Sequence, residues 1–235
     1  MNPILWNALK LFLFRSYFSQ HITKMIPKLH YISQGNSPKA HLDNIQNACA
    51  AGIELVVLDL QNSSEKKYLK TAKQARELTA HYQTRLIINT HLTIAKDLKV
   101  DGVHLDSTVQ DPITLRKKLF SWQWIGATAN NLEACETLSQ KEVDYIYLAP
   151  FRASEHTQNT VLGLNGFTAI QEALQTNTPI IGFGDITTTD VKAILETGIS
   201  GVGVSEQITQ DFNTIKLFNQ LLSASSTQEQ RHSFQ

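Results

Sequence analysis

The chain has 235 residues, of which 42% are hydrophobic and 18% charged, and its 21 basic side chains balance 21 acidic ones. This composition is typical of a soluble globular protein, and the length suits one α/β barrel or two small domains. The neutral net charge gives no reason to expect nucleic acid or an anionic membrane as a partner. With only Cys49 and Cys135, a disulfide scaffold is not expected and a reducing cytoplasm is the predicted location.

Residues 1–24 are predicted to be an extension outside the fold. Their apolar stretch, residues 5–15, is too short for a membrane span, and it lacks the early positive region and cleavage site of a signal peptide. A second methionine, Met25, stands just before the first predicted strand. The alternatives are an amphipathic helix that covers the folded unit or a partner, and a helix that binds a membrane surface.

Strand and helix patterns alternate from residue 27 onward. Strands are predicted at 29–33, 53–60, 85–89, 102–105, 124–128, 144–148, 179–183 and 201–204. Helices are predicted at 40–51, 64–81, 91–98, 112–120, 130–140, 166–175, 191–197 and 211–222. This alternation implies a parallel sheet, and eight regular units favour a (β/α)8 TIM barrel, an α/β fold, over a doubly wound open sheet. The barrel is predicted to occupy residues 25–222, followed by a disordered tail at 223–235.

The last two strands carry the clearest functional signal. The first of them ends in Gly182-Phe183-Gly184, and the second is followed directly by Ser205. Glycine where a strand meets a helix lets the backbone approach a phosphate, and loops after the last two strands of a barrel form a recurring phosphate site. The sequence therefore predicts a small-molecule phosphate ligand near Gly184 and Ser205, against the alternative that both are simple turns.

Other polar residues fall at the predicted strand ends, where a barrel places its site. Asn89 could orient a substrate or cap a helix, Thr128 could contact substrate or be a β-branched strand end, and Arg152 could bind an anion or form a surface ion pair. His91 and His156 are candidate general bases on loops, with solvated surface histidines as the alternative. The catalytic residue stays undetermined.

Some residues on the predicted strands are assigned to packing. His104 is interpreted as a hydrogen-bonded core histidine in preference to a catalytic one, and Tyr145 and Tyr147 as packing residues in preference to a stacking platform. A metal-binding pair of Asp59 and Asp106 is a minor alternative. No metal-type Cys/His spacing occurs, so no metal site is predicted from the residues themselves.

Six short motifs share their order and spacing with one known family. They are Ile87-Ile88-Asn89, Asp101-Gly102-Val103-His104-Leu105, Ile125-Gly126-x-Thr128, Asp144-Tyr145-Ile146-x-Leu148-x-Pro150, Leu162-Gly163-Leu164-x-Gly166 and Gly201-Val202-x-Val204. Over roughly residues 28–222 the sequence resembles thiamine-phosphate synthase and its TenI-type thiazole tautomerase relatives. The resemblance implies a (β/α)8 barrel that binds thiazole phosphate. In the synthase this phosphate is joined to aminopyrimidine diphosphate with magnesium, and diphosphate is released.

Several positions depart from the family pattern. At the second strand, Val57, Asp59 and Gln61 replace the family's Gln-x-Arg-x-Lys set. Thr90 and residues 106–109 stand where the family has its two magnesium carboxylates, and residues 154–157 stand where it has a lysine in the loop after Pro150. Asp185 replaces the second loop glycine, Glu206 the small residue after strand eight, and Asn130 the tautomerase histidine. Magnesium is thus implied by the resemblance while its usual ligands are absent. A departing diphosphate needs cations, and carboxylates in their place repel it.

The prediction from these observations is a thiamine-phosphate synthase-like protein whose activity is impaired. A TenI-like tautomerase, which needs no metal, is one alternative, with Asn130 leaving its base unassigned. A non-catalytic relative that binds thiazole phosphate or a partner enzyme is the other. The sequence leaves the oligomeric state open, a homo-oligomer included.

Overall fold

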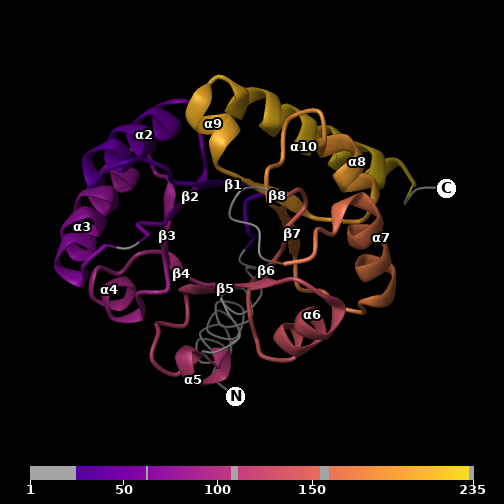
Figure 1. Ribbon diagram of the computed structural model, residues 1–235, viewed down its shortest axis with the longest axis horizontal. Helices are drawn as coiled ribbons and strands as arrows, with labels where there is room; N and C mark the ends of the chain where they lie inside the picture. The colour runs from indigo at the N-terminus through magenta and orange to yellow at the C-terminus, as the bar shows by residue number, and fades with distance from the viewer. Residues whose placement is uncertain (1–24, 62, 107–110, 154–158, 233–235) are drawn as a thin grey trace, which may run out of the picture.

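A computed structural model describes residues 25–61, 63–106, 111–153 and 159–232. Its eight strands pair in chain order as a closed parallel barrel, with β8 returning to β1 (Figure 1). The strands are β1 (Leu29–Ile32), β2 (Leu55–Leu58), β3 (Arg85–Asn89), β4 (Gly102–Leu105), β5 (Trp124–Ala129), β6 (Tyr145–Leu148), β7 (Ile180–Phe183) and β8 (Gly201–Val204). The predicted (β/α)8 barrel is confirmed. The calls on residues 1–24 and on His156 lie outside the described residues.

Helices form a ring around the barrel (Figure 1). They are α2 (Pro38–Ala50), α3 (Glu65–His81), α4 (Leu92–Asp97), α5 (Pro112–Arg116), α6 (Leu132–Ser139), α7 (Gly163–Ala173), α8 (Val191–Glu196), α9 (Glu206–Gln210) and α10 (Thr214–His232). Side-chain caps stabilise the starts of α2 and α6: the Ser37 and Asn131 side chains accept hydrogen bonds from the Ala40 and Ala134 amides, respectively. Such caps satisfy amide hydrogens that have no partner within the helix.

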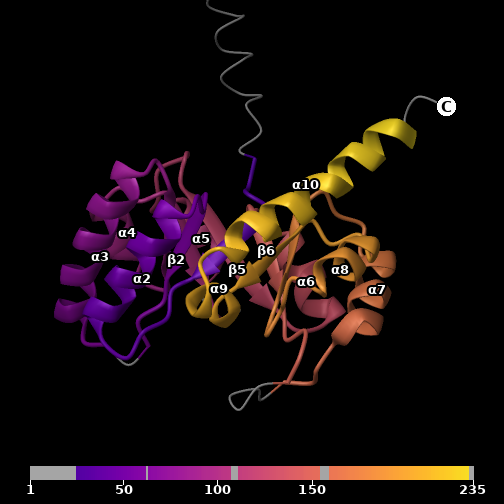
Figure 2. The ribbon, with the colours of Figure 1, turned by 90° about the horizontal axis from the view of Figure 1, so that it is seen from above.

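The end of the chain differs from the prediction. The helix α10 runs through Ser223 to His232, although a disordered tail was predicted from residue 223. Figure 2 shows the end of α10 extending away from the barrel. Leu222 is buried, with 2% of its surface exposed, whereas Ser223 and Ala224 are exposed. Once the packed part of a helix has formed, each further residue adds a backbone hydrogen bond without a new nucleation cost, so α10 continues beyond the core.

The core has two layers. Apolar residues between the sheet and the helices form the larger one. A smaller cluster fills the inside of the barrel, and it consists of Ile26, Ile32, Leu55, Val57, Ile87, Trp124, Tyr145, Tyr147 and Ile181. The barrel is therefore packed through its middle, and space for a ligand lies only at its ends.

Two of the motif aspartates are structural. Asp101 Oδ2 accepts a hydrogen bond of 2.8 Å from the Leu86 amide, and Asp144 Oδ2 accepts one of 2.7 Å from the Ile125 amide. Arg116 also pairs with Asp144. Both aspartates precede a strand, so they stabilise the amino-terminal end of the barrel and lie away from the end where barrel sites form.

Candidate functional site

An open cavity of about 1490 Å³ lies at the carboxyl ends of the strands. Four of the five predicted substrate-binding residues line it, namely Thr128, Arg152, Gly184 and Ser205. The fifth, Asn89, is not among the lining residues. Its side chain donates a hydrogen bond to Asp59, and Asp59 lines the cavity. The fold thus brings the predicted residues to one place, as the topology requires of strand ends in a barrel.

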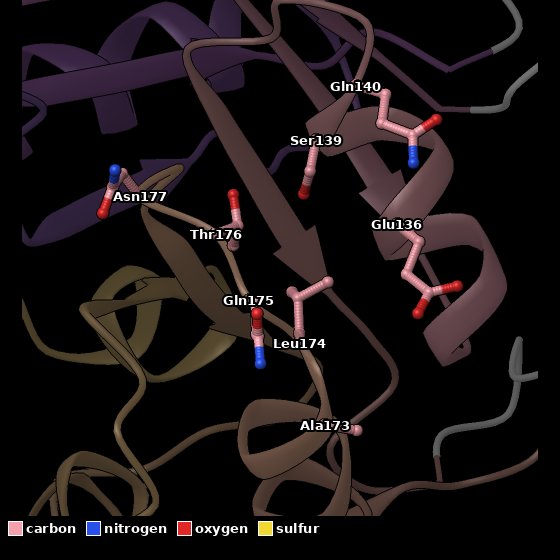
Figure 3. A pocket seen from close by; sticks show the side chains of 8 residues that line it. All are labelled: Glu136, Ser139, Gln140, Ala173, Leu174, Gln175, Thr176 and Asn177. Carbon is pink, nitrogen blue, oxygen red and sulfur yellow. The ribbon is translucent and has the colours of Figure 1, made fainter.

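A second hollow, of about 810 Å³, lies elsewhere. Figure 3 shows Glu136 and Ser139 of α6, with Gln140 just after it, on one side of the hollow and residues 173–177 on the other. These segments lead into β6 and β7, so the hollow belongs to the amino-terminal end of the strands. None of the described residues that line it is basic, and the larger cavity is the better candidate for a phosphate site.

Arg152, the one lysine or arginine among the described residues that line the cavity, already has partners. Its guanidinium lies 2.8 Å and 3.2 Å from the two carboxylate oxygens of Asp190, and Nη1 donates to the Asp185 carbonyl at 2.5 Å. The hydrogen bond to Asp190 raises the pKa of Arg152. A ligand anion would therefore compete with a carboxylate for this side chain.

The loop after β7 holds a turn that requires glycine. Gly184 has φ of +112°, and a Cβ at this position would lie 2.7 Å from the Phe151 amide nitrogen. Only glycine allows both this conformation and this approach. The Thr187 and Thr188 amides donate to Asp190 Oδ2 at 2.8 Å and to Gln207 Oε1 at 2.9 Å, so these two donors are used inside the protein.

Ser205 and the acidic residues beside it face the same cavity. The Ser205 hydroxyl donates to the Ile32 carbonyl at 2.8 Å. Asp185 and Glu206 also line the cavity, and both side chains are exposed to solvent. Exposure screens their repulsion of an anionic ligand but does not replace it with attraction.

Asn89 bridges the two carboxylates that sequence analysis considered as a pair. Its Nδ2 donates to Asp59 at 3.1 Å and to Asp106 at 2.8 Å, while Thr90 donates to its Oδ1 at 3.0 Å. Burial raises the pKa of Asp106, and the charge of Asp59 adds to the shift. In this arrangement the amide hydrogens of Asn89 lie between the two carboxylates, so a magnesium ion there would require the amide to rotate and present Oδ1. Within the described ranges, no three His, Cys, Asp or Glu side chains are grouped as metal ligands.

The candidate base His91 is not among the residues that line the cavity. Its ring packs on Tyr68, with 3.9 Å between the ring centroids, at the start of α4.

Sequence analysis missed a histidine that does line the cavity. His41 Nδ1 lies 2.9 Å from Ser33 Oγ, which also accepts from the Asp59 amide at 3.2 Å. Both side chains are buried. Burial lowers the pKa of His41, partly offset by its hydrogen bond to Gly35 and by the charge of Asp59. Ser33 ends the first predicted strand, a position that could have drawn attention to it.

Hydrogen-bonded polar side chains lie in the barrel interior beneath Thr128. His104 Nε2 lies 2.9 Å from Thr128 Oγ1, and His104 Nδ1 lies 3.1 Å from the Tyr145 hydroxyl. The ring of Tyr147 packs on that of Tyr145, with 5.3 Å between the ring centroids, and the Tyr147 hydroxyl lies 2.8 Å from His30 Nδ1. The interpretation of His104 as a hydrogen-bonded core residue agrees with these contacts, and the same contacts join it to the cavity.

Comparisons with known proteins assign the chain to a family. A family model described as thiamine monophosphate synthase matches residues 29–208, from β1 into α9. The chain belongs to the thiamine monophosphate synthase family. Thiamine-phosphate synthase of Flavobacterium johnsoniae is 33% identical over 84% of this chain and 95% of its own, and that of Bacteroides fragilis is 30% identical over 77% and 92%.

Solved structures agree with the fold of the thiamine monophosphate synthase family. Thiamine phosphate pyrophosphorylase from Pyrococcus furiosus has a TM-score of 0.72 and 21% identity, over 83% of this chain and 96% of its own. The resemblance drawn from the six motifs is confirmed. No described helix is long and apolar enough to cross a membrane.

Proposed function

We propose that this chain forms thiamine phosphate at the carboxyl-terminal cavity. The observation that carries the proposal is the family match over 29–208, which includes all eight strands and the loops at Gly184 and Ser205. In the reaction, the thiazole ring nitrogen attacks the methylene carbon of an aminopyrimidine diphosphate. The new C–N bond replaces the C–O bond, and diphosphate leaves with its electron pair.

The two substrates are proposed to bind at two sides of the cavity. The loops after β7 and β8, with Gly184 and Ser205, would hold the thiazole phosphate through backbone groups. The aminopyrimidine would lie towards Thr128 and Asp59. The resemblance implies magnesium, which Asp59, Asp106 and the rotated amide of Asn89 would hold, and we derive no step through it.

We further propose that turnover is slow. The leaving diphosphate gains negative charge, and Arg152 is held by Asp190. The other ionised groups at the described part of the cavity are the carboxylates of Asp59, Asp185 and Glu206. Because catalysis of such a departure depends on positive charge aimed at the leaving group, the rate should be low.

The pairing of Arg152 with Asp190 also supports a second candidate, a relative that binds thiazole phosphate without turnover. A tautomerase role has no such support: Asn130 accepts a hydrogen bond from Asn131 and offers no base. The reaction is proposed to occur in the cytoplasm, which the two buried, free cysteines support.

The test combines turnover with binding. Thiamine phosphate formation is assayed with both substrates and magnesium, and thiazole phosphate binding is measured by calorimetry. Slow formation supports the synthase, whereas binding without formation supports the second candidate. Absence of both would contradict the proposal.

A glycine substitution tests the place of the phosphate. Gly184→Ala forces a Cβ against Phe151 at positive φ, so the loop must move and affinity for thiazole phosphate should fall at least about tenfold. Gly52→Ala is the matched control, because Gly52 has φ of +91° but no atom within 4 Å of its Cβ position, and it lies in the turn after α2. Equal affinity in the two variants would place the phosphate elsewhere.

A further inference from the structure

Asp59 is held in place from two sides. It follows β2 directly, and its backbone amide donates a hydrogen bond of 3.2 Å to Ser33 Oγ, at the end of the neighbouring strand β1. On the other side its Oδ1 accepts a hydrogen bond of 3.1 Å from Nδ2 of Asn89, the last residue of β3. Ser33 is itself buried, and its Oγ lies 2.9 Å from Nδ1 of the buried His41. The carboxylate is therefore fixed before a ligand arrives, which lowers the entropy cost of binding to it.

The Asp59 carboxylate can accept more hydrogen bonds than the protein supplies. An ionised carboxylate has about four lone-pair positions, and among the described residues only Asn89 donates a hydrogen bond to this side chain. Asp59 lines the cavity and is partly exposed. Oδ2 would stay available if magnesium bound at Oδ1. The carboxylate can therefore accept hydrogen bonds from a ligand in the cavity.

The side of the cavity around Asp59 carries negative charge without a neighbouring cation. Burial lowers the pKa of His41, so its ring is neutral near pH 7. Arg152 follows β6, and it is paired with Asp190. The other polar side chains that line the cavity from residues 33–44 and 59–61 are uncharged, namely Ser33, Gln34, Asn36, Asn44 and Gln61. An anionic ligand group is therefore repelled here, and an N–H donor is attracted.

We infer that Asp59 determines which ligand this side of the cavity accepts, and that the ligand group it binds is the amino group of an uncharged or cationic nitrogen heterocycle. A heterocycle without that group would displace water from the carboxylate and leave it unpaired, which costs binding free energy. The same charge repels a diphosphate, so the amino preference and the proposed slow turnover have one cause. The inference rests on the proposed function in one respect: there, the heterocycle is the aminopyrimidine.

The first test uses the parent protein and two ligands that differ only in the amino group. Ligand-observed NMR titration near pH 7 measures the affinities for 4-amino-2-methylpyrimidine and for 2-methylpyrimidine. We expect the amino compound to bind at least about tenfold more tightly, because a hydrogen bond to a charged acceptor is gained. Equal affinities would overturn the inference. Neither thiazole phosphate nor turnover enters this measurement, so its failure is distinct from failure of the proposed function.

The second test removes the charge. Asp59→Asn keeps the shape of the side chain and an oxygen that can accept from Asn89. The preference for the amino compound should fall at least about threefold, because a neutral amide accepts a weaker hydrogen bond, and affinity for inorganic diphosphate should rise at low ionic strength. Asp185→Asn is the control, since Asp185 is an exposed carboxylate at the cavity with φ of 55°, a conformation that asparagine adopts readily. A preference unchanged by Asp59→Asn, or lowered equally in both variants, would contradict the inference.

A third variant separates contact from charge. Asp59→Glu keeps the charge but adds a methylene group, so the carboxylate leaves the position that Ser33 and Asn89 fix. The amino preference should fall about as far as in Asp59→Asn. Full retention of the preference would show that the negative field of the cavity, and not the held carboxylate, selects the ligand, against the inference. Because the first test uses the parent protein alone, it decides the inference even where a variant does not fold.

Discussion

Arg152 shows how one neighbouring side chain decides what a charged residue can do. The sequence identified it as an anion contact, and its place beside the cavity agrees. Its partner Asp190 could not be predicted, because the two residues are joined only by the closed arrangement of β6, β7 and their loops. The sequence shows that Arg152 is charged, but only the folded structure shows that Asp190 is already paired with it.

Freeing Arg152 should strengthen phosphate binding. Asp190→Asn removes the competing charge while keeping an oxygen that can accept from Thr187, so affinity for thiazole phosphate should rise about tenfold. Calorimetry at low ionic strength measures this, with Glu196→Gln on α8 as a control for losing a surface carboxylate. An affinity unchanged by Asp190→Asn would mean that Arg152 does not reach the ligand.

At the scale of elements, the strands were the most predictable part. Buried parallel strands are apolar on both faces, so each stands out between polar turns. The short helix α9 (Glu206–Gln210) was missed because it is too brief to show a helical period and the side chain of its N-cap residue, Ser205, makes no capping hydrogen bond to the helix. The site residues that lie at strand ends were predicted from the sequence. His41 was missed, because it lies on α2, which carries no motif.

Helix caps give a prediction at this scale. Ser37→Ala removes the hydrogen bond to the Ala40 amide and should lower the free energy of unfolding by about 1 kcal/mol. Ser64, at the start of α3, makes no such bond, so Ser64→Ala should change stability far less. Denaturant unfolding of both variants compares them. Equal losses would show that intrinsic propensity, and not the cap, determines the effect.

The barrel as a whole buries two neutral histidines. The pKa of His30 is lowered to about 4 and that of His104 to about 3, by burial, from 6.5. Below pH 6.5 the unfolded chain therefore binds protons that the folded chain does not, and stability falls as the pH falls towards 4. The polar interior could not be predicted, because His30 and Tyr147 meet only once β1 and β6 face each other across the ring.

The size of this effect is measurable. At pH 5 each histidine should cost about 2 kcal/mol relative to pH 8, or about 4 kcal/mol together. Urea unfolding at the two pH values gives the difference. In the His30→Asn/His104→Asn double variant the contribution of these two residues should disappear, while that of the buried His41 remains, and in His81→Gln, at an exposed position on α3, the full difference should remain. Equal stability of the parent protein at pH 5 and pH 8 would contradict the prediction.

The two cysteines can report on the opening of the closed barrel. Cys49 is a buried residue of α2 and Cys135 a buried residue of α6, and these two helices lie on opposite sides of the ring (Figure 1). Both thiols are buried, and burial raises the pKa of each. A thiol reagent can therefore react with either only when that part of the ring opens. The labelling rate of each cysteine therefore reports how often its half of the barrel opens. If the two halves of the closed ring depend on each other, the two rates should agree.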